Sequence, residues 1–392
     1  MAFTSKPETS YSDAIKIMLE PVCLGDLDLS NRFVMASLTR GRCGENGVPD
    51  QINAEYYRQR TNFGLIISEA TAISPMAEGW FGAPGIYTDA QIDGWKQVVD
   101  LVHQQGGKIV CQLWFVGRGS HSSFLPAGER VVAPSSIPII PGSPGVRPGV
   151  TLASGVVADY EVPRELSKAE IAAIVEDWGV AAANCKLAGF DGIEIHAANG
   201  YLISTFLESC SNQRTDEYGG TFANRFKFLK EILERVSKEF SSRRVGIKIS
   251  PNNAYGGMGS SDNNELFRYV LTELNQFDLA YVQIMDQVNE RMGYHGKCPV
   301  QGLDDLRKYY KGNLVANSGY TAETGGRRVL EGLAQAVAYG RVSLSNPDFV
   351  ERIRNGWPLA NPMPATEYYP KDLKHHQDHS IGYTDQPTAH PS

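Results

Sequence analysis

The chain has 392 residues, of which 42% are apolar and 21% charged, with 39 Gly, 21 Pro and 6 Cys. This composition is typical of a globular protein and excludes the disordered, collagen-like and disulfide-stapled classes. The net charge of −7 comes without any cluster of Lys and Arg, which argues against nucleic acids and anionic membranes as partners.

Nothing in the sequence predicts export or insertion into a membrane. The polar residues 1–13 contain no apolar signal-peptide segment, and no stretch reaches the roughly 20 apolar residues that span a bilayer. The six cysteines form no CxxC pair, which fits a reducing compartment and buried thiols. We therefore expect a cytoplasmic protein.

Eight short apolar segments recur along the chain and are predicted to be β-strands. Each is apolar on both faces, which is typical of parallel strands buried under helices. These segments are residues 32–35, 65–68, 109–113, 192–195, 245–249, 281–284, 314–316 and 336–338.

Segments with helical spacing separate the predicted strands. Residues 88–91 and 167–170 are capping boxes, which predict helices that begin there and end at Gly106 and Gly189. Further helices are expected over residues 222–240, 265–277 and 322–333. The alternation predicts a single (β/α)8 TIM barrel of the α/β class over residues 1–370, with a doubly wound open sheet as the alternative.

Two segments lie outside this alternation. Residues 117–163 are rich in Pro and Gly and predict an excursion over the barrel mouth after the third strand. Residues 371–392 are polar and aperiodic and predict a flexible C-terminal tail. Four of the eight histidines lie in this tail, so metal binding is the alternative to a solvated segment: His375, His376, His379 and His390.

Chemistry in such a barrel lies at the C-terminal ends of the strands, so the polar residues found there are the candidates. After the fourth strand, His196 and Asn199 can both donate a hydrogen bond to one oxygen, and Tyr201 offers a phenol that is protonated at neutral pH. Two donors and a proton source suit the polarisation of a carbonyl and the protonation of its α-carbon. A structural role for His196 is the alternative.

Two glycines and an arginine after the last two strands predict a phosphate site. Gly319, Gly340 and Arg341 follow the last two strands, and a helix is expected to start near residues 345–347. Lys248 lies within an apolar strand and should face an anionic or electron-rich partner, unless its side chain reaches the surface instead. Together these residues favour a phosphorylated cofactor. The chain contains no GxGxxG, GxxxxGK[ST], HExxH or GxSxG motif, which argues against four other classes of site.

Several of these segments resemble the Old Yellow Enzyme family of FMN-dependent ene-reductases, of the NADH:flavin oxidoreductase/NADH oxidase type. The resemblance extends from about residue 17 to about residue 370. Its most specific parts are HAANGYL at residues 196–202 and SNQRTDEYGG at residues 211–220. Further matching segments are residues 31–35, 38–40, 73–75, 112–114 and 339–348.

The resemblance implies a TIM barrel with an N-terminal hairpin lid and FMN in its mouth. NADPH or NADH would reduce the flavin, which passes a hydride from N5 to the β-carbon of an α,β-unsaturated carbonyl. By position, His196 and Asn199 would hold the carbonyl oxygen, and Tyr201 would protonate the α-carbon. The implied cofactor contacts are Ser37, Leu38, Thr39, Ala70, Gln112, Lys248, Ser318, Gly319, Gly340 and Arg341, and the implied substrate pocket includes Trp114, Phe115 and Tyr368.

The chain departs from the family pattern at Ser37, Ala70, Phe115, Ser204 and Lys248. Similar departures occur in fungal relatives from natural-product pathways and imply a specialised substrate. Two other functions stay open: a redox-neutral, flavin-assisted double-bond isomerase, and a silent flavin-binding barrel. The presence of Tyr201 favours net reduction. The expected partner is a small molecule, the expected state a monomer or homodimer, and no metal is expected in the barrel.

Overall fold

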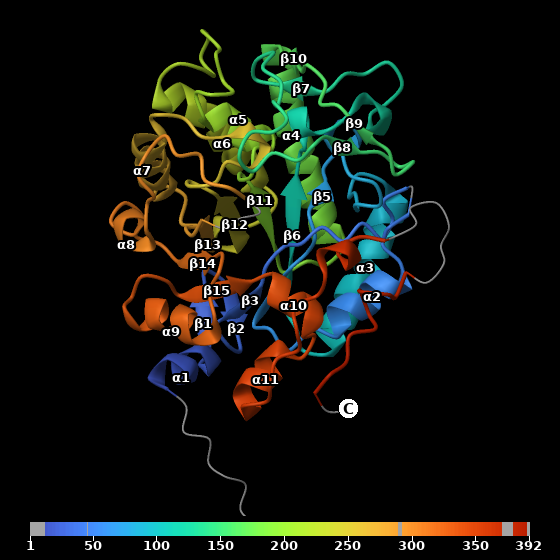
Figure 1. Cartoon of the computed structure of the whole chain (residues 1–392), viewed down its shortest axis with the longest axis vertical. Helices are drawn as coiled ribbons and strands as arrows, with labels where there is room; N and C mark the ends of the chain where they lie inside the picture. The colour runs from blue at the N-terminus through green and yellow to red at the C-terminus, as the bar shows by residue number, and fades with distance from the viewer. Residues whose placement is uncertain (1–11, 45, 289–291, 371–378, 390–392) are drawn as a thin grey trace, which may run out of the picture.

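Eight parallel strands close into a barrel in the computed structural model, which describes residues 12–44, 46–288, 292–370 and 379–389. Neighbouring strands pair in chain order, and the barrel closes where the last strand pairs with the first. The predicted TIM barrel is therefore confirmed, and the open sheet is wrong (Figure 1). The barrel strands are β3 (Phe33–Met35), β4 (Leu65–Ile67), β6 (Ile109–Trp114), β11 (Gly192–His196), β12 (Val245–Ile249), β13 (Tyr281–Met285), β14 (Leu314–Asn317) and β15 (Ala336–Tyr339).

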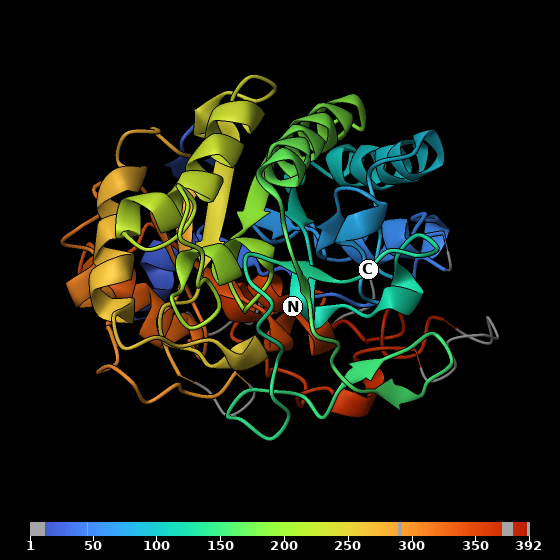
Figure 2. The ribbon, with the colours of Figure 1, turned by 90° about the horizontal axis from the view of Figure 1, so that it is seen from above.

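Helices surround the barrel, and three long ones, α3, α4 and α6, line one side of it in the view of Figure 2. Both predicted capping boxes form, with Thr88 accepting from the Gln91 N–H and Ser167 accepting from the Glu170 N–H. The helices are α1 (Asp13–Leu19), α2 (Gln51–Arg58), α3 (Asp89–Gln104), α4 (Lys168–Leu187), α5 (Leu202–Leu207), α6 (Phe222–Val236), α7 (Asn263–Leu274), α8 (Leu303–Leu306), α9 (Ala322–Leu330), α10 (Arg341–Ser345) and α11 (Phe349–Asn355).

Three helices end earlier than predicted. Helices α6, α7 and α9 end three or four residues before the predicted bounds. The apolar residues Phe240, Phe277 and Leu333 pack against the core from the turns that follow these helices. The apolar pattern therefore runs past the point where the helical hydrogen bonds end.

The predicted N-terminal hairpin lies across the barrel end opposite the mouth. Strands β1 (Val22–Leu24) and β2 (Leu27–Leu29) pair antiparallel, and their leucines join one buried cluster with inward-facing barrel residues. At the turn, the Asp26 N–H donates to the carbonyl of Arg243, just before β12 begins. Gly25 has φ +60° there, and a Cβ would lie 2.2 Å from that carbonyl oxygen, so the turn requires glycine. The hairpin thus closes the N-terminal end of the barrel.

The excursion after β6 forms two small sheets, which lie above β6 in Figure 1. Strand β7 (Val132–Ala133) pairs parallel with β10 (Arg164–Glu165), and β8 (Val150–Thr151) pairs antiparallel with β9 (Val157–Ala158). The segment between β7 and β8 reaches the barrel mouth, where Arg147 lines the main cavity. The predicted excursion over the mouth is confirmed.

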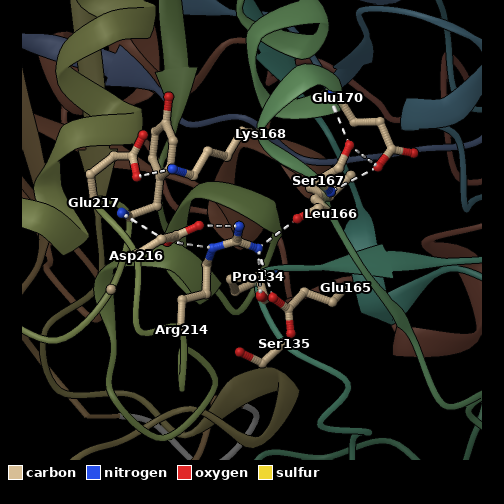
Figure 3. A network of polar contacts seen from close by, with 12 residues as sticks. Pro134, Ser135, Glu165, Leu166, Ser167, Lys168, Glu170, Arg214, Asp216 and Glu217 are labelled. Atoms are coloured by element: carbon tan, nitrogen blue, oxygen red, sulfur yellow. Dashed lines mark hydrogen bonds and ion pairs between the residues drawn. The ribbon is translucent and has the colours of Figure 1, made fainter.

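One arginine holds the two ends of this excursion together (Figure 3). The Arg214 side chain is 4% exposed and donates to the carbonyls of Pro134, 3.1 Å away, and Leu166, 2.6 Å away. It also forms a two-point ion pair with Asp216, at 3.0 and 2.6 Å. Pro134 follows β7 and Leu166 follows β10, so Arg214 fixes the base from which the excursion extends.

The C-terminal segment differs from the predicted flexible tail over residues 379–389. Tyr383 is fully buried and stacks on Tyr56 with ring centroids 4.1 Å apart, and its hydroxyl accepts from Asn53 at 3.0 Å. Arg42 donates to the carbonyl of Ile381 at 2.9 Å. A single aromatic anchor and backbone carbonyls hold the segment, and neither produces a periodic pattern in the sequence.

Several sequence predictions fall outside the described residues: the polar start at residues 1–11 and three tail histidines, His375, His376 and His390. Within the described part of the chain, no three His, Cys, Asp or Glu side chains gather in a way that could hold a metal ion. No helix among the described residues has the length and apolar character needed to cross a membrane.

Candidate active site

A cavity of about 570 Å³ opens at the C-terminal ends of the barrel strands. Because all eight strands are parallel, the residues at their C-terminal ends meet at this one mouth. Inward positions alternate along each strand, which places Gln112 and Trp114 of β6 and His196 of β11 on the cavity side. The predicted site residues that line the cavity are Ser37, Leu38, Thr39, Ala70, Gln112, Trp114, His196, Asn199, Tyr201, Lys248, Ser318, Gly319, Gly340, Arg341 and Tyr368.

Phe115 is the predicted site residue that the structure places elsewhere. It is 1% exposed and is absent from the residues that line the cavity, whereas the preceding Trp114 is among them. Successive side chains of a strand point to opposite faces, so Phe115 turns away from the cavity that Trp114 faces. The placement of Phe115 in the substrate pocket is therefore wrong.

His196 and Asn199 each have one polar atom occupied and one left for the cavity. The Nδ1 atom of His196 accepts from the Ala198 N–H at 3.4 Å, which leaves the proton on Nε2. The Oδ1 atom of Asn199 accepts from the Asn253 side chain at 2.9 Å, which leaves the Nδ2 protons. Burial and the nearby Lys248 charge hold the pKa of His196 well below its usual range, so the ring is neutral. The pair can offer two neutral donors to one oxygen.

Asn199 lies in a strained turn between β11 and Tyr201. Its φ is +60°, a conformation that non-glycine residues adopt rarely, and Gly200 follows with φ +69°. The Asn199 N–H donates to the Ser250 hydroxyl at 2.9 Å, which ties the turn to the end of β12. A side chain at Gly200 would approach the carbonyl of Tyr255 to 2.8 Å. The turn therefore returns the chain into the mouth, and Tyr201 follows it.

Tyr201 lies beside His196 in an aromatic setting. Its ring centroid is 4.9 Å from that of His196 and 4.8 Å from that of Trp114, edge-on in both cases. Burial raises the pKa of Tyr201 well above its usual range, and the neighbouring Tyr255 adds to this effect. The phenol is therefore protonated at neutral pH and can act as a proton donor.

Lys248 is a buried cation on β12, in register with His196 on β11. It is 5% exposed and lines the cavity, and its ammonium has no hydrogen bond or ion pair to another described residue. Burial lowers its pKa, and the charge of Glu194 partly opposes this. Glu194 is fully buried inside the barrel, where it accepts from Gln112 at 2.5 Å and from Gln283 at 2.6 Å. Glu194 therefore fixes the amide of Gln112 and supports the charge of Lys248.

The ends of β14 and β15 have the backbone geometry of an anion site. Ser318 and Gly319 have φ values of +93° and +79°. Helix α10 begins at Arg341 directly after β15, with Gly340 as its N-cap. A helix does start close to the predicted residues 345–347, since α11 begins at Phe349 with Asp348 as its N-cap. The short helix α10, which begins as soon as β15 ends, was not predicted.

Other lining residues were not predicted from the sequence. Trp80, Arg147, Tyr255 and Tyr369 line the cavity on the substrate side, around Tyr201. They come from the loop after β5 (Thr71–Ala72), the excursion, the segment after β12 and the C-terminal segment. No strand or helix periodicity ties these loops to the mouth. The one available sequence feature was the placement of Tyr369 next to the predicted Tyr368.

A model of the NADH:flavin oxidoreductase / NADH oxidase family matches residues 17–360. The chain is 40% identical over 361 residues to the probable flavin mononucleotide-dependent alkene reductase of Leishmania infantum, covering 92% of this chain and 96% of that protein. It is 38% identical over 373 residues to 12-oxophytodienoate reductase 2 of Arabidopsis thaliana, with 95% of each covered. The solved structure of morphinone reductase in complex with tetrahydroNAD matches with a TM-score of 0.83 and 39% identity, over 95% of this chain and 97% of that one.

Proposed function

Because the chain belongs to the NADH:flavin oxidoreductase / NADH oxidase family, we propose a role for each side chain at its barrel mouth. The chain is an FMN-dependent ene-reductase that uses NAD(P)H to reduce the C=C bond of an α,β-unsaturated carbonyl compound. When bound, FMN takes up two electrons from the nicotinamide and delivers them as a hydride to the β-carbon. The observation that supports the assignment best is that the Nε2–H of His196, the Nδ2 protons of Asn199 and the protonated phenol of Tyr201 lie at one cavity.

The lining of the cavity fits FMN. A buried ammonium without a hydrogen-bond partner among the described residues suits the electron-rich edge of a flavin ring, and Lys248 supplies it. Thr39 and the fixed amide of Gln112 would hold the polar edge of the ring. At the other end, Arg341 and the turn at Gly319 would bind the phosphate. Ser37, Leu38, Ala70, Ser318 and Gly340 complete the proposed cofactor contacts.

The substrate would bind between the cofactor and the aromatic wall. The Nε2 proton of His196 and the Nδ2 protons of Asn199 would hold the carbonyl oxygen and withdraw charge from the double bond. Tyr201 would then give its hydroxyl proton to the α-carbon and recover a proton from solvent. Trp114 and Tyr368 would form walls of the substrate pocket.

The position of Tyr201 favours net reduction over the isomerase and the silent barrel. An isomerase returns the electrons to the same molecule and needs no NAD(P)H, whereas a phenol beside the carbonyl donors suits protonation of a reduced product. A specialised-metabolite substrate, the cytoplasmic location and a monomeric or dimeric state stay predictions.

The function is tested by following the flavin through one turnover. The purified protein, loaded with FMN, should show flavin absorption that NADPH bleaches without oxygen and cyclohexenone restores, with cyclohexanone as the product. Rearranged product without NADPH consumption would establish the isomerase instead. Failure of every unsaturated carbonyl to reoxidise the reduced flavin would establish the silent barrel.

Replacing His196 by Ala is expected to weaken the binding of a phenol to the oxidised holoenzyme by about 10- to 100-fold, because a phenolate oxygen takes the place of the carbonyl and loses a donor to a charged atom. The measurement is a titration of the long-wavelength band that the phenol produces over the flavin. His103→Ala is the matched control, since His103 lies on α3 and pairs with Asp191. Equal affinity in wild type and His196→Ala would remove His196 as an oxygen ligand.

A further inference from the structure

Arg147 is an arginine of the excursion that reaches the catalytic phenol. Its guanidinium carbon lies 4.2 Å from the ring centroid of Trp80 and 6.0 Å from that of Tyr369. Its Nη2 atom donates to the hydroxyl of Tyr369 at 3.5 Å, a long hydrogen bond. The aromatic rings therefore hold the plane of the guanidinium and leave most of its five N–H donors for another group.

Arg147 also lines two neighbouring cavities. Next to the main cavity lies a second one of about 150 Å³, lined mainly by apolar and aromatic residues such as Phe81, Ile139 and Val150. The residues that border both cavities are Trp80, Arg147, Asn199, Tyr201, Tyr255 and Tyr369. A substrate held at Asn199 and Tyr201 can therefore extend a side arm into the second cavity, past Arg147.

The described residues that line the two cavities carry positive charges and no negative ones. Among the described residues that line them there is no Asp or Glu, although the whole chain has a net charge of −7. Of the cations, Lys248 lies near Glu194, and Arg40 donates to the carbonyls of Tyr368 and Gly382. Arg341 lies at the proposed phosphate site.

Arg147 is the remaining cation among the described residues that line the two cavities, and none of the contacts given above accounts for its charge. It has no ion pair to a described residue, and a guanidinium keeps its charge at any pH at which the protein is folded. A cation placed beside the reacting group without an anion is unfavourable unless a ligand supplies one.

We propose that Arg147 binds a carboxylate carried by the substrate, on a short chain that enters the second cavity. This rests on the proposed function and narrows it: the preferred substrate is an unsaturated carbonyl compound with an acidic side arm. The planar fork of arginine matches a carboxylate with two parallel hydrogen bonds. A phosphate of the nicotinamide coenzyme is another source of anionic oxygens. Among the described residues that line the second cavity, however, Arg147 is the sole charged one, which suits one carboxylate better than a diphosphate.

The test compares an acid with its own methyl ester. Reduced holoenzyme is reoxidised by a cyclohexenone that bears a carboxymethyl arm and by the corresponding ester, and kcat/KM is measured for each. Arg147→Met keeps the length of the side chain over Trp80 and removes the charge. We expect the acid-to-ester ratio of kcat/KM to fall by about 10- to 100-fold in this variant, and Arg147→Lys to recover part of the loss.

The other outcomes separate the sources of the anion. Rates of flavin reduction by NADPH and by NADH are measured for the same variants. A loss with both coenzymes would overturn the proposal in favour of the diphosphate that they share, and a loss confined to NADPH would overturn it in favour of the phosphate that NADH lacks. An unchanged acid-to-ester ratio in Arg147→Met would also overturn it, and Arg147→Gln repeats the comparison if the Met variant loses its flavin. Wild-type enzyme that neither compound reoxidises would contradict the proposed function itself.

Discussion

Replacing Tyr201 by Phe is expected to slow the reoxidation of the reduced enzyme by an unsaturated carbonyl by about 10²- to 10⁴-fold, the range that a positioned proton donor contributes. The phenyl ring keeps the edge-on contacts with Trp114 and His196, so the pocket retains its shape. Only the hydroxyl is lost, and with it the proton for the α-carbon. Reduction of the flavin by NADPH involves no such proton and should proceed as in wild type.

Rapid mixing separates the two half-reactions. Flavin bleaching by NADPH and its recovery with cyclohexenone are recorded for Tyr201→Phe and for Tyr310→Phe, a buried tyrosine that does not line the cavity. Because burial raises the pKa of Tyr201, the wild-type recovery rate should not fall as the pH passes the ordinary tyrosine value of about 10. Equal slowing of both half-reactions in Tyr201→Phe would show that the ring positions ligands and donates no proton.

The strands of the barrel were predictable because burial on both faces makes each of them a short, continuous apolar segment. All eight strands have apolar segments, and the polar residues that follow them lie at the mouth, since a parallel barrel delivers every strand end to one place. Phe115 was misplaced by one position, since Trp114 lines the cavity and the next residue, Phe115, does not. A single-residue assignment at the end of a strand depends on register, which a fully apolar strand does not reveal.

The parts that the sequence did not predict are set by contacts between distant loops. Arg147 lies in a Gly- and Pro-rich segment, and its partners Trp80 and Tyr369 come from far away in the chain. Tyr383 is held by the ring of Tyr56 and by the amide of Asn53. Such pairs have no fixed spacing, so neither hydrophobic periodicity nor local motifs point to them.

The two most specific sequence segments, residues 196–202 and 211–220, have different structural roles. HAANGYL brings His196, Asn199 and Tyr201 to the cavity. SNQRTDEYGG contributes no residue to the described lining of the main cavity, and its Arg214 instead binds the carbonyls of Pro134 and Leu166. Residues 211–220 therefore affect the active site indirectly, because Arg214 holds the base of the excursion that carries Arg147.

Replacing Arg214 by Met is accordingly expected to lower the free energy of unfolding by about 3 kcal/mol, because two backbone carbonyls lose their donor and Asp216 loses its cation in a largely buried site. Lys168→Met is the control in the same region (Figure 3): Lys168 pairs with Glu217, but their side chains are 59% and 43% exposed, so the cost should be within about 1 kcal/mol. Denaturant unfolding of the holoenzyme measures both. Equal costs in the two variants would contradict the role of Arg214.

The same ion pair gives this contribution a pH dependence with a definite sign. Arg214 holds the pKa of Asp216 below its usual value, so the stabilisation is present above the unfolded-state pKa of about 4 and is lost as the pH falls through the lower folded-state value. The difference in unfolding free energy between wild type and Asp216→Asn should therefore shrink as the solution is acidified below about pH 4. Since the carbonyl contacts of Arg214 do not titrate, Arg214→Met should keep part of its cost at that pH. Because Arg214 anchors the base of the excursion, its loss should also reduce the acid-to-ester discrimination that depends on Arg147, which links the fold of this segment to the choice of substrate.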